Sequence, residues 1–174
     1  MSFFDGIQGD ADHAFVKSFT VIPDNTTAVA EIKSIAIDEF NGEKAYEFTW
    51  KIIDGDFKGQ QVRQKIKCWQ TDEAKLKRAK SMLLLLMTMF ELKFARDDHP
   101  NEFDLMPLHG KIGGIKIGYI MSQKQDGSVG EYNFVREIHP AAGFECKTGE
   151  SPRVESAFSR NPRTQKELDG DLPF

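Results

Sequence analysis

One stretch of helical periodicity interrupts a chain whose other apolar segments alternate like β-strands. No Gly or Pro occurs between Asp72 and His99, and Thr71 or Asp72 can cap the first helical turn. The apolar residues of this stretch return every three or four positions: Leu76, Ala79, Leu83, Leu86, Met87 and Phe90. At ~1.5 Å per residue, about 24 residues would form a helix roughly 36 Å long. Because residues 83–87 are apolar on nearly every side, we expect this helix to be packed on more than one face.

Three strand-like segments precede the helix. Residues 26–38 alternate, but the alternation changes phase at Lys33-Ser34, which indicates a β-bulge or a sharp bend. Asn41-Gly42 favours a tight hairpin turn into a second strand at residues 44–53. Because Trp50 alternates in phase with Phe48 and Ile52, we expect it in the core. The third strand-like segment covers residues 60–70.

Two more strand-like segments, residues 111–121 and 131–138, follow a loop at residues 97–108. The order of three strands, one helix and two strands predicts a mainly β chain. It is typical of the OB-fold, a five-stranded Greek-key barrel with an α-helix between strands 3 and 4. The alternative is an unrelated α+β sheet with the helix across one face. Hydrophobic periodicity is missing at both ends, so we expect residues 1–16 to be a flexible N-terminus, residues 17–140 the OB-fold domain and residues 141–174 a flexible, disordered tail.

The formal net charge is −4, which taken alone argues against a nucleic-acid partner. The charges are unevenly distributed, however. Residues 51–80 hold nine Lys or Arg against four Asp or Glu, whereas acids dominate the N-terminus and the last eight residues. A locally basic region beside acidic ends is compatible with binding a polyanion.

The third strand carries the candidate binding surface. Its alternation predicts that Arg63, Lys65, Lys67 and Trp69 share one face, opposite Val62, Gln64, Ile66 and Cys68. Cations contact phosphates and an indole ring stacks on bases, so this face suits single-stranded DNA of any sequence. Lys51, Lys116 and Tyr132 are further candidates for DNA binding, although Tyr132 and Phe134 either stack on bases or belong to the core. The competing interpretation is an ordinary solvated strand face on which the start of the helix half covers Trp69.

No enzyme constellation emerges from the sequence. The four histidines are scattered without acids or cysteines at ligand spacing, and Cys68 and Cys146 lack the paired spacing of a zinc or redox site. Asp97, Asp98, Glu102 and Asp104 could bind a cation as nuclease carboxylates do, but a solvated acidic loop is the simpler interpretation. We therefore expect a non-catalytic protein without a metal or cofactor.

Neither export nor membrane insertion is expected. Asp5, Asp10 and Asp12 precede the first basic residue, Lys17, which does not fit a secretory signal. The longest apolar run, residues 82–90, is too short to span a bilayer. Two free thiols suit a reducing compartment, so we expect a cytoplasmic protein. Whether it forms homo-oligomers is left open.

The last residues, Glu167-Leu168-Asp169-Gly170-Asp171-Leu172-Pro173-Phe174, carry a resemblance to a known family. They resemble the acidic tip of bacterial single-stranded DNA-binding proteins, and several phage counterparts likewise end in acids and a terminal aromatic. In those families an OB-fold body holds DNA and the tip docks other proteins. The resemblance implies that Asp169, Asp171, Leu172, Pro173 and Phe174 are the docking residues here. It covers about eight residues and the plan of barrel and tail, and this tip departs from the bacterial pattern in its spaced acids.

The expected function is sequence-independent binding of single-stranded DNA in phage or bacterial replication, recombination and repair. By resemblance, the tip would recruit replication and recombination proteins in the cytoplasm of the bacterial host. The alternatives are an OB-type adaptor of a recombination system that does not itself bind DNA, and a nuclease that uses the acids of residues 97–104.

Overall fold

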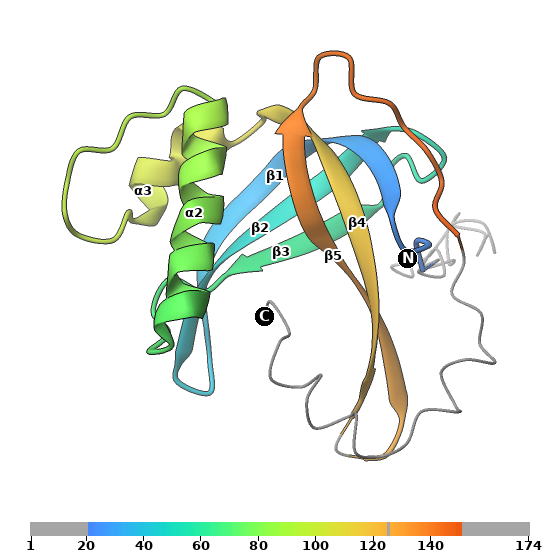
Figure 1. Ribbon diagram of the computed structural model, residues 1–174, viewed down its shortest axis with the longest axis horizontal. Coiled ribbons are helices and arrows are strands. Elements are labelled where there is room, and N and C mark those ends of the chain that lie inside the picture. The colour runs from blue at the N-terminus through green and yellow to red at the C-terminus, as the bar shows by residue number, and fades with distance from the viewer. Residues whose placement is uncertain (1–20, 125, 151–174) are drawn as a thin grey trace, which may run out of the picture.

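The computed structural model describes residues 21–124 and 126–150. Within them the chain is mainly β. The elements are β1 (Thr26–Phe40), β2 (Glu43–Asp54), β3 (Gln61–Ile66), α2 (Glu73–Met89), α3 (Glu102–Leu105), the 3₁₀ helix η1 (Met106–Leu108), β4 (Ile112–Gln123) and β5 (Val129–Pro140). The five strands form one mixed sheet that closes into a ring in the order β1-β2-β3-β5-β4 (Figure 1). The expected strand order, with a helix between the third and fourth strands, is confirmed.

Strand β1 closes the ring because it pairs with a neighbour on each side. Its residues 26–31 pair antiparallel with β4, and residues 29–40 pair antiparallel with β2. The register with β2 shifts between Ile32 and Ser34, so Lys33 is an extra residue in the strand. This confirms the bulge expected at Lys33-Ser34, and the local bend lets one strand serve two partners. The hairpin to β2 turns at Asn41 and Gly42, whose φ values of 52° and 79° are those of the tight turn that the sequence indicated.

Pairing between β3 and β5 is sparse. In the described part of the chain these strands pair in parallel at one position, Arg63 with Phe134. The ladders β1–β2 and β4–β5 instead run along most of each strand. Helix α2 packs beside the β3–β5 seam and buries Leu83, Leu86 and Met87 in the core.

The inner faces of β2 and β3 fill the ring as their alternation predicted. Tyr46, Phe48, Trp50 and Ile52 are fully buried, which confirms the expectation for Trp50. The facing residues Val62, Gln64, Ile66 and Cys68 are buried as well. Gln64 is a polar residue in this apolar interior, and its Oε1 accepts a 2.9 Å hydrogen bond from Trp50 Nε1. The pair satisfies two polar groups that would be costly to bury alone.

Helix α2 begins where expected but is shorter than expected. Asp72 caps it by accepting a 2.9 Å hydrogen bond from Lys75 N. It has 17 residues, not about 24, because Glu91 adopts a positive φ of 57° that ends the helix. The expectation that it is packed on more than one face is also wrong, since Leu84 and Leu85 are exposed. The loop expected at residues 97–108 contains the short helices α3 and η1.

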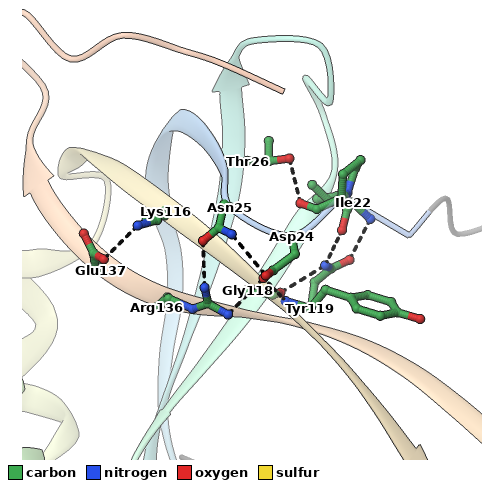
Figure 2. Close-up of polar contacts among 11 residues, drawn as sticks. Ile22, Asp24, Asn25, Thr26, Lys116, Gly118, Tyr119, Arg136 and Glu137 are labelled. Carbon is green, nitrogen blue, oxygen red and sulfur yellow. Dashed lines mark hydrogen bonds and ion pairs between the residues drawn. The ribbon is translucent and has the colours of Figure 1, made fainter. Parts of the chain in front are cut away.

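The segment before β1 is tied to β4 and β5 by side chains (Figure 2). The Asn133 side chain accepts a 2.8 Å hydrogen bond from Ile22 N and donates one of 2.8 Å to Ile22 O, which imitates strand pairing. Asp24 Oδ1 accepts hydrogen bonds from Tyr119 N at 3.0 Å and from Arg136 Nη2 at 2.9 Å. The chain is therefore fixed to the ring before its first strand begins.

The ring domain extends past the boundary expected at residue 140. Thr27 N donates to Lys147 O at 2.8 Å, and Lys147 N donates back to Thr27 O at 3.1 Å. The Phe144 ring covers Gly114, where an added Cβ would lie 2.4 Å from Phe144 Cγ. Residues 141–150 are thus not the start of a free tail. The expectations for residues 1–16 and 151–174 lie outside the described residues.

The buried Trp50–Gln64 pair can be tested by replacing Gln64 with an apolar side chain of similar size. Gln64→Leu leaves the indole N–H buried without its acceptor, so the free energy of unfolding should fall by about 1–3 kcal/mol. In the double variant Trp50→Phe/Gln64→Leu both polar groups are gone, so the loss should be smaller than the sum of the two single losses. Urea denaturation gives the free energy of unfolding of the wild type, the two single variants and the double variant. Strictly additive losses would contradict an energetic coupling between the two side chains.

Candidate nucleic-acid interface

A groove of about 920 Å³ runs along the outer face of β3 between two hairpins. One wall comes from the β1–β2 hairpin, around residues 38–45, and the other from the β4–β5 hairpin, around residues 122–134. Figure 1 shows both hairpins projecting from the same side of the ring. We call this feature the hairpin groove.

The cations predicted on β3 meet in the hairpin groove. Arg63, Lys65 and Lys67 all line it, because Val62, Gln64 and Ile66 point into the ring and alternation turns their neighbours outward. The sequence identified these three residues correctly as one surface.

Carboxylates already form ion pairs with the two lysines of the groove. Lys65 Nζ lies 2.7 Å from Asp38 Oδ2 and 3.4 Å from Glu47 Oε2, and Lys67 Nζ lies 2.7 Å from Glu43 Oε2. The hydrogen bond from Lys65 lowers the pKa of Asp38, and the one from Lys67 lowers the pKa of Glu43. The acids hold the ammonium groups in place along the groove. An incoming anion must displace them.

Aromatic rings lie beside the cations. Phe40, at the end of β1, is 70% exposed, and Tyr132 on β5 is 41% exposed. Phe134 completes this group, and all three line the hairpin groove. Two of the rings lie over glycines: a Cβ added at Gly130 would fall 2.5 Å from Tyr132 Oη, and one at Gly118 would fall 2.4 Å from Phe134 Cζ. The glycines leave the space in which these rings lie against the strand.

Sequence reasoning found Tyr132 and considered Phe134, but it missed Phe40. A signal was present, since a large aromatic directly before an Asn-Gly turn falls at a hairpin tip, where little can bury it.

The expectation that Trp69 shares the face of Arg63, Lys65 and Lys67 is wrong. Strand β3 ends at Ile66, so alternation no longer fixes where Trp69 points. Its ring stacks on His99, with centroids 4.5 Å apart and an interplanar angle of 11°, and it also contacts Tyr46 at 4.7 Å. Trp69 packs against the core.

Lys51 and Lys116 are not among the residues that line the hairpin groove either. Lys51 lies on β2 opposite Gln61, beyond the end of the cation row. Lys116 lies on β4, and its Nζ is 3.1 Å from Glu137 Oε1 (Figure 2). Six residues of strand, or about 20 Å, separate it from Ser122 in the groove wall.

Three of the four acids considered for metal binding have structural partners. Glu102 Oε1 accepts a 2.8 Å hydrogen bond from Ile37 N, Asp104 caps α3, and Arg96 pairs with Asp98 and Asp104. Across residues 21–124 and 126–150, no group of three His, Cys, Asp or Glu is placed to hold a metal ion. Burial raises the pKa of the Cys68 thiol to about 11, so it stays protonated near neutral pH.

No helix in the described ranges has the length and apolar character needed to cross a membrane.

No protein-family model matches the chain, and no curated protein matches it. Among solved structures, a chain described as yeast RPA bound to ssDNA is 15% identical, with a TM-score of 0.36 over 95% of this chain and 98% of that one. A TM-score this low does not establish a shared fold.

Proposed function

We propose that this chain binds single-stranded DNA without reading its sequence. The observation that carries the proposal is the hairpin groove, which places three cations beside two exposed aromatic rings and the half-buried ring of Phe134. Single-stranded DNA presents phosphates and unpaired bases together, and cationic grooves with stacking rings bind both. Ammonium and guanidinium groups contact any phosphate, and an aromatic face accepts any base, so the groove fits every sequence.

The ring of strands is proposed to be an OB-fold. Support comes from its order β1-β2-β3-β5-β4, its parallel β3–β5 contact, and the helix between β3 and β4. OB-folds bind oligonucleotides on the face of strands 2 and 3, between the loops that join strands 1–2 and 4–5. The hairpin groove lies at the corresponding place, along β3 between the β1–β2 and β4–β5 hairpins.

The proposal extends to a non-catalytic role in the replication, recombination and repair of a phage or its bacterial host, in the host cytoplasm. Residues 169–174 would recruit partner proteins. This part is supported by the resemblance of the tip to that of bacterial single-stranded DNA-binding proteins, and by its chemistry. A Phe ring can fill an apolar pocket while the neighbouring acids steer the approach to a basic surface.

Neutralising Arg63 and Lys65 of β3 together with Lys67, which directly follows it, should weaken DNA binding and reduce its dependence on salt. Each phosphate contact contributes about 0.7 to the slope of log affinity against log salt concentration. The slope of the variant Arg63→Gln/Lys65→Gln/Lys67→Gln should therefore be roughly 2 units shallower than that of the wild type. Lys58→Gln, an exposed lysine of the β2–β3 loop, is the control and should behave as wild type. Asp38→Asn/Glu43→Gln should act in the opposite direction, because the paired lysines are released to the ligand.

Fluorescence anisotropy with labelled oligo-dT at several salt concentrations gives these slopes. Absence of binding by the wild-type chain would overturn the proposed function and favour the adaptor alternative. Metal-dependent loss of the oligonucleotide would instead point to the nuclease.

Stacking can be tested with two equally exposed phenylalanines. Phe40 is 70% exposed in the hairpin groove, and Phe103 is 76% exposed on α3, outside it. Phe40→Ala should weaken oligo-dT binding by about 1–3 kcal/mol, whereas Phe103→Ala should leave affinity unchanged. Equal effects of the two variants would show that Phe40 does not stack on a base.

The tip is tested by Phe174→Ala, with Phe158→Ala as a control in the same tail. Both should bind oligo-dT at least as well as the wild type. Only Phe174→Ala should lose the replication or recombination proteins that the wild type retains from a host extract, because the ring is the expected hot spot. Retention of the same proteins by both variants would contradict a docking role for the tip.

A further inference from the structure

A second cleft, of about 350 Å³, opens between α2 and the β3–β5 seam. It exists because β3 and β5 pair at Arg63 and Phe134 and then separate, while α2 covers the gap from the side. We call it the seam cleft. Its floor is partly apolar, with Ile66, Ala79 and Met82.

The walls of the seam cleft carry charges of one sign. Five cations line it, namely Lys65, Lys67, Lys75, Arg78 and Arg136, and no described residue in its lining is an Asp or Glu. The hairpin groove differs, because Asp38, Glu43 and Glu131 are part of its own lining. A polyanion that entered the seam cleft would therefore meet a lining in which the described charged residues are all cations.

The cations of the seam cleft differ in their ion pairing. Lys65 and Lys67 pair with acids of the β1–β2 hairpin, on the side of the hairpin groove. Arg136 pairs with Asp24, so it is partly occupied by the anchor of the N-terminal segment (Figure 2). Arg78 is exposed and has no ion-pair partner within the described ranges. The cation most available to a ligand is thus on α2.

The two clefts adjoin each other. Lys65, Lys67 and Phe134 line both, so a strand lying in the hairpin groove reaches the seam cleft without leaving the protein surface. Lys75 and Arg78 are three positions apart on α2, and neighbours at this spacing project from the same side of a helix. Lys75 and Arg78 on one wall, with Lys65 and Lys67 on the other, place positive charge on both sides of the cleft.

Resting on the proposed function, we propose that the seam cleft binds the sugar–phosphate backbone of the DNA strand beyond the hairpin groove, with Lys75 and Arg78 on its phosphates. The strand turns at Phe134, crosses the β3–β5 seam and continues along α2. The helix is then part of the DNA-binding surface as well as a support for the core. The binding site is longer than the hairpin groove alone.

Binding of oligo-dT series from about 4 to about 16 nucleotides, the range of OB-fold site sizes, tests this path. The full chain is compared with Lys75→Gln/Arg78→Gln and with the control Lys77→Gln/Lys80→Gln. The control removes the same charge from the same helix, on the side that faces a different surface hollow. The variant Arg78→Lys retains the charge and should retain binding.

The shortest oligonucleotides should bind equally to all four proteins, because they occupy the hairpin groove alone. With the longest, Lys75→Gln/Arg78→Gln should lose affinity and about 1.4 units of log–log salt slope, two phosphate contacts at about 0.7 each. The control Lys77→Gln/Lys80→Gln should lose less than half of that salt slope. If the wild type binds and the two double variants match at every length, the seam cleft is not on the DNA path, while the proposed function stands. If the wild type binds no oligonucleotide, the proposed function itself fails.

Discussion

The extra residue at Lys33 in β1 determines which side chains reach the hairpin groove. Before it, Ala28, Ala30 and Ile32 point into the ring, and after it Ile35 and Ile37 pack against the core. Side-chain direction alternates along a strand, so an unbroken β1 would turn Asp38 and Phe40 inward. The bulge reverses the phase, and both residues line the groove instead. The same strand pairs with β4 through residues 26–31 and with β2 through residues 29–40, so β1 contributes to both ring closure and the groove wall.

Much of the fold was predictable because it depends on local patterns. Alternation along β1, β2 and β3 identified the bulge and the buried faces, and Asn41-Gly42 identified the hairpin. The row Arg63, Lys65 and Lys67 was predictable for the same reason. The end of α2 was not predictable, because no Gly or Pro marks it and the residue that adopts the left-handed conformation there is a glutamate, Glu91. The packing of residues 141–150 on β1 rests on backbone hydrogen bonds that leave no apolar pattern.

The errors at Trp69 and Lys116 are instructive in different ways. For Trp69, alternation was counted past the end of the strand, where a stacking contact with His99 determines the ring position. Lys116 is on a strand, but the position of that strand in the ring separates it from the groove. Neither error could be corrected without tertiary structure. The roles of Gly118 and Gly130, which leave room for aromatic rings on β5, likewise depend on which residues become neighbours across and along the strands.

The sparse pairing at the β3–β5 seam has a dynamic consequence. Opening the ring there breaks a single ladder position, whereas opening it at β1–β2 or β4–β5 would break a long run of pairs. Local fluctuations concentrate where the fewest interactions must be broken, so we expect the ring to open more readily at this seam than at either long ladder. Arg63 and Phe134, which form the single pair, also line the hairpin groove, and Phe134 lines the seam cleft. Opening at this seam would therefore alter both clefts, and a ligand bound across both would hold β3 and β5 together.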